Sequence, residues 1–527
     1  MLRRDALRLI GLSALAPAAG RLSVADAWAH TPPAQNPDVE ILLRAAPDQL
    51  ALLRGQPTNV WRFTGRVVRG PSDVLQQASS SYLGPTIRVR RGQRVRVRFE
   101  NGLSEESIVH WHGLDVPQQA DGHPRLVVGP GREYRYDFTV TNRAGTYWYH
   151  PHPHMRTGPQ VYMGLAGLFI VEDDEEGALG LPEAQSELLC VIQDRKFDEA
   201  NQLVYPDTSE MGQMGAGRRG MGMGRGRGMG GMMAMLELEN GVLGDHVLVN
   251  GQPEYTAEVE AGWVRLRLLN GSNARIYRLA WHDKRPMTVI GNDGGLLERP
   301  LTRTALTLAP AQRADLLVDV SDLREGGRLR LLSLPFPTDE AGHVGMMMGD
   351  ASSLPQGTQM EVMTLRARGR NTRHVQLPDR LTSYDASWQV APAAPVRRVP
   401  LTFTQMQWLI DGRTFEMTDV AEVERVKAGS THVWELVNTT NPMGMQMAHP
   451  IHLHGRQFRV LSRSGGSPVS ELRPAIVDGG WTDTVLVLPG ETVRVQVTFS
   501  DHRGLFLYHC HILEHEDMGM MRNFRIE

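Results

Sequence analysis

Residues 92–101 read GQRVRVRFEN, a stretch in which apolar and charged side chains alternate. A period of two residues is typical of a β-strand with one buried face. The same pattern returns at 262–270, GWVRLRLLN, and more loosely at 429–438, GSTHVWELVN. The asparagines that close the three stretches lie 169 and 168 residues apart, and the inward positions agree when counted back from each. This spacing indicates one unit that occurs three times.

A second marker supports the repeat. In each unit a turn with proline precedes another short alternating strand, and the turns are again evenly spaced along the chain. The pairs are Pro130-Gly131 before 134–140, Pro310-Ala311 before 314–320, and Pro489-Gly490 before 493–499. Helical periodicity is weak throughout, and short strands with Gly and Pro turns favour Greek-key β-sandwiches. We therefore predict an all-β chain with three sandwich domains at 40–172, 185–370 and 395–527.

The composition agrees with a soluble globular protein. Among 527 residues, 22% are charged and 41% are hydrophobic, and the formal net charge is −3. A nucleic-acid binder needs a basic surface, so this balance argues against nucleic acid as a partner. The two cysteines exclude a framework of disulfides. No apolar run is long enough to span a membrane.

The N-terminus has the form of an export signal. Arg3 and Arg4 precede an apolar stretch at 9–19, and small-residue cleavage sequences follow near residues 25–29. Paired arginines before such a stretch are typical of the twin-arginine route. We expect residues 1–30 to be a signal peptide and the mature protein to be periplasmic or otherwise exported.

The histidines are concentrated in pairs. Among 19 histidines, five His-x-His pairs occur: His110/His112, His150/His152, His152/His154, His452/His454 and His509/His511. Residues i and i+2 of a strand face the same side, so each pair directs two imidazoles at one place. Neutral imidazole is the commonest metal ligand in proteins and suits copper. The pattern predicts a metal centre built from several histidine pairs.

The last pair identifies the metal more closely. Residues 509–520 read HCHILEHEDMGM, in which Cys510 lies between two histidines and points away from them. One thiolate, two imidazoles and a weak thioether form a blue-copper electron-transfer site. Cys510, His515 and Met520 would supply three of these ligands, and His449 the fourth. The other cysteine, Cys190, lies in an apolar stretch typical of a core strand.

These segments together resemble those of the multicopper oxidases. The resemblance covers nearly the whole mature chain and includes HWHG at 110–113, YHPH at 149–152, HPIHLH at 449–454 and the Cys510 segment. It is closest to the bacterial cuprous oxidases and the thermophilic bacterial laccases. The resemblance implies three cupredoxin-like domains and four copper ions.

Position by position, the resemblance also implies the ligands of one type 1, one type 2 and two type 3 copper ions. The type 1 copper takes His449, Cys510, His515 and Met520; the type 2 copper takes His110 and His452; one type 3 copper takes His112, His150 and His511, and the other takes His152, His454 and His509. No ligand of the family pattern is missing. His154 is left over, and we expect it to have a supporting or surface role.

The ligand pairs belong to the first and third repeats only, since the histidines of the middle repeat are unpaired. We therefore expect the cluster to form where the first and third domains meet, with the middle domain as a spacer. Cys510 would carry electrons from the type 1 site to the cluster, because its neighbours His509 and His511 are both type 3 ligands.

Two acids match carboxylates that the family places near the cluster. Asp121 lies in the loop after the first histidine pair, and Glu516 follows His515. A carboxylate held in a site can pass protons to a reacting group, so we predict both as proton relays to oxygen. The alternative is that each is a solvated loop charge.

Methionine is unusually frequent in one segment. Residues 211–235 hold eight Met, ten Gly and four Arg, a composition that we expect to form a mobile insertion without a core. Thioethers select Cu(I), so substrate copper would bind among these methionines and those before His449. The candidates are Met221, Met223, Met229, Met232, Met233, Met445 and Met447. Met445 stands where the family has an acidic residue, so this chain departs from the family pattern at the substrate site.

Three functions are compatible with these residues. The first is a multicopper oxidase that uses O₂ to oxidise Cu(I), and more weakly phenols and aromatic amines, in copper detoxification. The second is a general laccase for phenols. The third is an exported copper-binding or sequestering protein without turnover. A copper nitrite reductase fits less well, because three domains and two type 3 ligand sets exceed its needs. We expect a monomer.

Overall fold

The computed structural model describes residues 36–183, 186–206, 227–342, 354–370, 375–404, 407–438 and 446–527, and at 227–233 only the helical backbone. Residues Asp38–Glu527 form one compact unit. The predicted signal peptide lies outside the described residues. None of the described helices is both long enough and apolar enough to cross a membrane.

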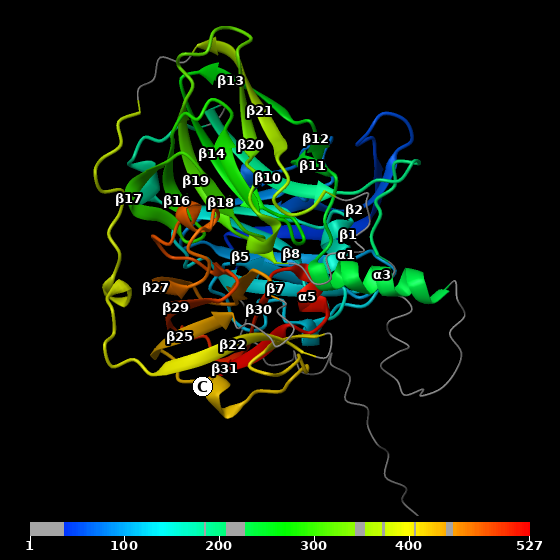
Figure 1. Ribbon diagram of the computed structural model, residues 1–527, viewed down its shortest axis with the longest axis vertical. Coiled ribbons are helices and arrows are strands. Elements are labelled where there is room, and N and C mark those ends of the chain that lie inside the picture. The colour runs from blue at the N-terminus through cyan, green and yellow to red at the C-terminus, as the bar shows by residue number, and fades with distance from the viewer. Residues whose placement is uncertain are drawn as a thin grey trace, which may run out of the picture. The chain divides into compact units, whose positions relative to one another are not determined.

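The described residues form six sheets, which follow one another along the chain in three pairs (Figure 1). The first pair has the strand orders β2-β1-β5-β7 and β3-β4-β9-β8-β6. Its strands are β1 (Val39–Leu50), β2 (Thr58–Arg69), β3 (Leu75–Gln76), β4 (Thr86–Arg90), β5 (Arg94–Asn101), β6 (Val109–His112), β7 (Glu133–Thr139), β8 (Gly145–Pro151) and β9 (Gly167–Glu172).

The second pair has the orders β12-β11-β10-β14-β19-β16-β17 and β13-β21-β20-β15-β18. Its strands are β10 (Glu187–Arg195), β11 (His246–Val249), β12 (Gln252–Pro253), β13 (Thr256–Ala261), β14 (Trp263–Asn270), β15 (Tyr277–Trp281), β16 (Met287–Asn292), β17 (Gly295–Arg303), β18 (Leu306–Leu308), β19 (Arg313–Asp319), β20 (Arg328–Ser333) and β21 (Met360–Arg370).

The third pair has the orders β23-β22-β25-β29-β27 and β24-β31-β30-β26-β28. Its strands are β22 (Val396–Thr404), β23 (Gln407–Ile410), β24 (Arg425–Val426), β25 (Thr431–Asn438), β26 (His449–Leu453), β27 (Phe458–Gly465), β28 (Thr484–Val487), β29 (Glu491–Thr498), β30 (Gly504–Cys510) and β31 (Met521–Ile526). The three domain boundaries stay a prediction.

The predicted repeat of strands is present in the structure. The three alternating stretches are the strands β5, β14 and β25, and each pairs antiparallel with the strand after the proline turn, β7, β19 or β29. Each also pairs in parallel with the first strand of its own sheet, β1, β10 or β22. Parallel neighbours need a crossover connection, and here the chain passes through the opposite sheet of the pair, at β4, β13 or β24, before it returns.

The repeated asparagine has the same task each time. Asn101, Asn270 and Asn438 are buried, and each side-chain amide donates to two backbone carbonyls. One acceptor always lies two residues before the proline, at Val128, Leu308 or Val487. The asparagine therefore ties the end of one strand to the turn that begins the next.

Each pair of sheets encloses an apolar core. In the first pair, Val95 and Val97 of β5 belong to the same buried cluster as Ile87 and Val89 of β4, which lies in the opposite sheet. Corresponding clusters fill the second and third pairs. The alternation along each strand therefore directs one face inward, as the sequence predicts.

Five α-helices lie between the described strands: α1 (Thr157–Tyr162), α2 (Asp174–Gly177), α3 (Arg227–Asn240), α4 (Thr338–Ala341) and α5 (Leu513–Asp517). Part of the methionine-rich segment is helical, since 227–235 begin α3, whereas 211–226 lie outside the described residues. The mobility expected for 211–235 stays a prediction, although the backbone of 227–235 is helical. The C-terminal end of α3 buries Leu238 and Glu239 and lies beside α5 (Figure 1).

Candidate metal centre

Two pairs of strands at equivalent places carry the histidines. In the first pair of sheets β6 lies beside β8 and sets His110 opposite His150. In the third pair β26 lies beside β30 and sets His452 opposite His509. Each strand, or the residue just after it, adds a second histidine two positions on. Eight histidines are thereby buried: His110, His112, His150, His152, His452, His454, His509 and His511.

The histidines of the first pair of sheets lie against those of the third pair. The Nε2 atoms of His110 and His452 are 3.4 Å apart, although the residues are 342 positions apart in the chain. His509 Nε2 lies 3.4 Å from His152 Nε2 and 3.1 Å from His454 Nε2. The structure therefore brings the histidines of the first and third repeats into one cluster.

The cluster divides into groups that resemble the expected ligand sets. His152, His454 and His509, expected for one type 3 copper, have ring nitrogens close enough to share one ion. His110 and His452, expected for type 2, belong to another such group. The remaining set, His112, His150 and His511, is not among the groups of described residues whose ligand atoms all lie close together, although the ring centres of His112 and His150 lie 5.0 and 5.3 Å from that of His511.

Most of these rings have one nitrogen fixed by an oxygen acceptor, which leaves the other for a metal. His110 Nδ1 donates to the carbonyl of Asp121, His150 Nδ1 to that of Pro151, and His509 Nδ1 to that of Cys510. Among the described residues, the opposite nitrogen of His150 is buried without a hydrogen-bond partner, and so are both ring nitrogens of His511. Such orphaned atoms are costly unless an ion binds them, and supporting acceptors are typical of metal-ligating histidines.

The protonation state also suits a metal. Burial lowers the pKa of His110, His112, His150, His152, His454, His509 and His511, and that of His150 falls to about 3. These imidazoles are neutral at pH 7, which is the form that binds copper. The residues present therefore fit a cluster of copper ions.

A second, smaller group lies within the third repeat. Cys510 Sγ is 3.5 Å from His449 Nδ1 and 3.6 Å from His515 Nδ1, and all three residues are buried. Met520 is also buried, and its carbonyl accepts from the Cys510 amide at 3.1 Å. Burial raises the pKa of the Cys510 thiol, so the thiolate needs a metal ion beside it. The donor set is that of a blue-copper site.

Two residues outside the predicted ligands hold this group in place. His515 Nε2 donates to the backbone carbonyl of Glu239 on α3 at 2.9 Å, and Trp408 Nε1 donates to the same carbonyl at 3.1 Å. The Trp408 ring packs against both His449 and His515, with ring centres 4.6 and 5.1 Å away. Sequence patterns did not indicate either contact, because strand β23 and helix α3 meet the site only in the fold.

Cys510 joins the two groups. Its sulfur faces His449 and His515, while its neighbours His509 and His511 belong to the larger cluster. The two centres are thus separated by the side chain and a few backbone bonds of three consecutive residues. This is the arrangement that the alternation of a strand predicts.

Both predicted proton relays lie against cluster histidines. Asp121 is fully buried, and its carboxyl group accepts from His454 Nδ1 at 2.9 Å. Glu516 lies 3.2 Å from His509 Nδ1 and 3.4 Å from His152 Nε2. Burial raises the pKa of both carboxyl groups well above the usual range. Neither is a solvated loop charge, and the raised pKa means that burial favours the protonated form of each.

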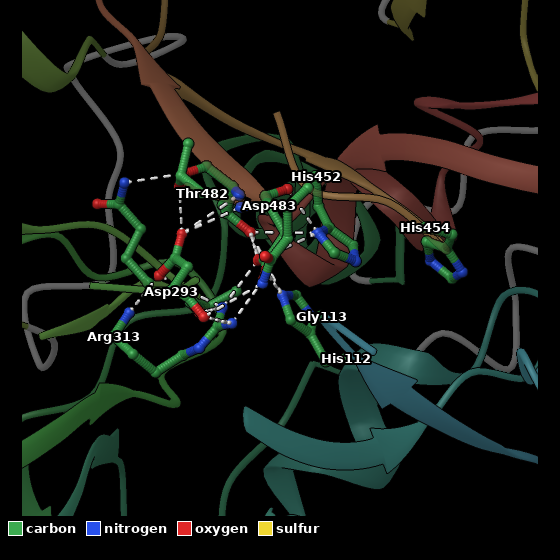
Figure 2. Close-up of polar contacts among 12 residues, drawn as sticks. His112, Gly113, Asp293, Arg313, His452, His454, Thr482 and Asp483 are labelled. Atoms are coloured by element: carbon green, nitrogen blue, oxygen red, sulfur yellow. Dashed lines mark hydrogen bonds and ion pairs between the residues drawn. The ribbon is translucent and has the colours of Figure 1, made fainter. Parts of the chain in front are cut away.

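A third carboxylate was missed by the sequence analysis. Asp483 is fully buried, and its Oδ1 accepts from His112 Nε2 at 3.0 Å (Figure 2). Its partner on the other side is Arg313, which lies in β19 of the middle repeat. Burial alone would raise the pKa of Asp483, but the Arg313 guanidinium holds it below the usual range. The middle repeat is therefore more than the spacer that we expected, and a single unpaired Asp gave no signal in the sequence.

The remaining sequence candidates are placed as follows. Met447 is buried in the same apolar cluster as Cys510 and Met520, so it is not on an exposed surface. Met221, Met223 and Met445 lie outside the described residues, and the side chains of Met229, Met232 and Met233 are not described. His154 lies outside the groups of described residues that could share an ion, with its ring centre 5.1 Å from that of Phe415.

The sequence is similar to known proteins over most of its length. Two family profiles, both described as multicopper oxidase, match residues 67–176 and 389–527. The chain is 30% identical over 448 residues to the multicopper oxidase Mco of Staphylococcus aureus, which covers 85% of this chain and 83% of that protein. It is 28% identical over 514 residues to the laccase of Bacillus subtilis (strain 168), with 88% and 90% covered.

A solved structure agrees with these relatives. The McoA multicopper oxidase of the hyperthermophile Aquifex aeolicus superposes with a TM-score of 0.73 and 34% identity, over 93% of this chain and 97% of that chain. The predicted all-β, cupredoxin-like fold is therefore confirmed.

Proposed function

This chain belongs to the multicopper oxidase family, and we propose that it oxidises Cu(I) to Cu(II) with O₂ as the electron acceptor. The balanced reaction is 4 Cu(I) + O₂ + 4 H⁺ → 4 Cu(II) + 2 H₂O. Phenols and aromatic amines are weaker reductants in this proposal. The protein would be exported by the twin-arginine route and would lower the toxicity of copper outside the cytoplasm.

One observation carries the proposal: every ligand of the family pattern is buried, and the ligands converge in two groups joined at Cys510. Four resident copper ions, one type 1, one type 2 and two type 3, would accept electrons singly and deliver four to O₂. A family member that had lost this chemistry would have lost ligands. A sequestering protein would not need the Cys510 connection between the two groups.

The chain's own residues divide the remaining work. Cys510 supplies the route for electrons, because its thiolate and backbone connect the two groups. Asp121 and Glu516 supply protons, since each holds a carboxyl group against cluster histidines in a water-poor interior. The hydrogen bonds from ring nitrogens to carbonyls hold the imidazoles in place so that little reorganisation is needed during turnover.

The preference for Cu(I) rests on what lies over His515. The carbonyl of Glu239 accepts a hydrogen bond from His515 Nε2. Helix α3 therefore covers the ring edge through which a reductant would deliver electrons. The Glu239 carboxylate is buried, and both oxygens lack a hydrogen-bond partner among the described residues. Met235 precedes Glu239 by four residues and therefore lies on the same helix face. A carboxylate and a thioether can bind a copper ion, whereas a phenol ring would be excluded.

A general laccase is the second candidate, because the chain resembles the laccase of Bacillus subtilis. The two candidates differ in the reductant that is used fastest. The α3 cover favours a small ion, and a laccase needs an open edge at His515.

Steady-state oxygen consumption distinguishes the alternatives. It is measured with Cu(I) and with a phenol, for the copper-loaded protein and for a variant without residues 211–235. Cys510→Ser serves as the control for non-enzymatic oxidation. We expect faster turnover with Cu(I), and we expect the deletion to lower it while raising phenol turnover. Faster phenol turnover by the intact chain would favour the laccase, and copper binding without oxygen uptake would leave only sequestration.

A further inference from the structure

Asp483 contacts two histidines of the cluster with different atoms. Its side chain accepts from His112 Nε2 at 3.0 Å, and its backbone carbonyl accepts from His452 Nδ1 at 2.8 Å. His112 comes from the first repeat and His452 from the third, so one residue reaches histidines on both sides of the interface. Figure 2 shows Asp483 between these rings and Arg313.

The two contacts fix opposite nitrogens of the two rings. His112 has Nε2 occupied by Asp483, and its Nδ1 is buried with no hydrogen-bond partner in the part of the chain that the structure describes. His452 has Nδ1 occupied, and its Nε2 faces His110 Nε2 at 3.4 Å. In a neutral imidazole the nitrogen that donates carries the hydrogen, which leaves the other nitrogen's lone pair for a metal. The Thr484 hydroxyl lies 3.3 Å from His112 Nε2 and 3.2 Å from His452 Nδ1 and donates to Asp483 Oδ1. Asp483, with this hydroxyl beside it, thereby selects Nδ1 as the donor atom of His112 and Nε2 as that of His452.

Asp483 is in turn clamped by the middle repeat. Arg313 Nη1 donates to Asp483 Oδ1 at 2.8 Å, and Nη2 donates to Oδ2 at 2.5 Å. Such paired contacts fix the plane of a carboxylate as well as its distance. Lysine could supply the charge but could not hold both oxygens in this way.

Arg313 is itself fixed from two directions. Its backbone amide donates to Asp293 Oδ1 at 2.7 Å, and its Nε donates to the carbonyl of Thr146 in β8 at 2.9 Å. The other carboxylate oxygen of Asp293 accepts from the Thr482 hydroxyl, one residue before Asp483. Arg313 and Asp293 therefore hold both the side chain of Asp483 and the backbone that leads into it.

The first repeat leaves space for this contact. Gly113 follows His112 with a φ of +87°, and a Cβ placed there would lie 2.5 Å from Asp483 Oδ2 and 2.8 Å from Arg313 Nη2. Any side chain at residue 113 would therefore push the pair away from the histidines. The requirement for glycine follows from the packing of all three repeats at one point.

We propose that Arg313, with Asp293, is a positioning residue for the histidine cluster: by clamping Asp483 it determines which ring nitrogens of His112 and His452 face the metal. The inference rests on the copper assignment proposed above. It gives the middle repeat, which holds no expected copper ligand, a direct part in organising the cluster. It also makes assembly of the centre depend on contact among all three repeats.

The test compares Arg313→Lys with Arg275→Lys. Arg275 is equally buried in the middle repeat and pairs with Asp194 at 2.6 Å, but it does not contact the cluster histidines. Each protein is loaded with copper, and four properties are measured: bound copper per chain, the type 1 absorption, the type 2 electron paramagnetic resonance spectrum, and the turnover number. Thermal unfolding of the metal-free forms monitors folding.

We expect Arg313→Lys to change the type 2 spectrum and to lower turnover by about 10- to 100-fold, the usual loss when a group that orients a metal ligand is removed. The type 1 absorption should be unchanged, and Arg275→Lys should match the unmodified protein in all copper signals. An unaltered type 2 spectrum with turnover equal to that of Arg275→Lys would overturn the inference.

A variant that does not fold and a failure of the proposed function can both be distinguished from a failure of this inference. If Arg313→Lys does not fold, Asp293→Asn, which keeps the Arg313 guanidinium but weakens the hold on residues 482–484, is judged by the same criteria. If the unmodified protein binds copper without consuming oxygen, the proposed function fails, while the type 2 spectra still decide the positioning role.

Discussion

The small group around Cys510 and the histidine cluster are built in different ways. The Cys510 group takes His449, Cys510, His515 and Met520 from one repeat, and the principal contact from elsewhere is the carbonyl of Glu239. The cluster needs rings from His110 to His511, which lie 401 residues apart in the chain, and carboxylates between them. The Cys510 group therefore depends on local strand geometry, whereas the histidine cluster depends on how the repeats pack.

The largest expected effect comes from removing the connection between the two centres. Cys510→Ser should abolish the intense blue absorption and reduce oxygen consumption to background with every reductant, a loss beyond the roughly 100-fold that supporting contacts cost. The cluster histidines keep their own contacts, so type 2 and type 3 copper should remain. Absorption spectra and copper analysis check this. Residual turnover with Cu(I) would show that electrons bypass Cys510.

Asp121→Asn should impair the histidine cluster and leave the Cys510 group unaffected, which is the reverse of the effect expected for Cys510→Ser. The amide cannot deliver a proton, so oxygen reduction should fall by about 100-fold or more, within the usual range for a lost general acid. Anaerobic reduction of the type 1 site should keep its rate, because Asp121 does not contact that site. Stopped-flow absorption measures both steps. Asp115→Asn is the control, since Asp115 lies nearby but pairs with Arg456 at 2.6 Å; equal oxygen reduction in the two variants would contradict the relay.

A pH-dependent effect is expected at α5, between the centres. Glu514 is buried, and it accepts from Asn273 Nδ2 at 2.7 Å and Tyr205 at 3.0 Å. Burial raises its pKa from 4.5 to about 7. A carboxyl group whose pKa is raised on folding contributes its full stabilisation only when the pH is below its pKa in the unfolded chain, here 4.5. This stabilisation is lost as the pH rises through the folded pKa of about 7.

Glu514→Gln should therefore gain stability relative to the unmodified metal-free protein as the pH rises from 5 to 9. The expected gain is on the order of 3 kcal/mol. Chemical unfolding at both pH values measures the difference. A constant difference between the two pH values would show that Glu514 does not titrate in this range.

The smallest effect is expected at the edge of the Cys510 group. Trp408→Phe keeps a ring against His449 and His515 but removes the hydrogen bond to the Glu239 carbonyl. We expect a loss of about 1 kcal/mol in unfolding free energy and a modest rise in phenol turnover as α3 loosens. The type 2 spectrum should not change. An altered type 2 spectrum would mean that the two centres are not independent.

Sequence reasoning gave the strands and the ligand pairs because both follow a period of two. The alternation at 92–101 fixed which side chains point inward, and the same rule put His509 and His511 on one side of Cys510. The repeated asparagines were visible as a spacing, and the structure adds their reason, which is the pair of carbonyls that each one holds.

The contacts that organise the cluster could not be derived in this way. Asp483 and Arg313 are single residues separated by 170 positions, and neither belongs to a periodic pattern. Helix α3 was missed because its glycine-rich sequence has low intrinsic helix propensity, and its C-terminal end is instead stabilised by tertiary contacts with α5 and Trp408. Tertiary packing determines these features, so they became visible only in the folded chain.

The most direct test of the account is an anomalous-scattering map at the copper edge from crystals of the copper-loaded protein. We expect three peaks among the eight clustered histidines and one beside Cys510 Sγ, between His449 and His515. Peaks on the surface only, or a filled Cys510 site beside an empty histidine cluster, would contradict the claim that the first and third repeats together form an oxygen-reducing copper centre.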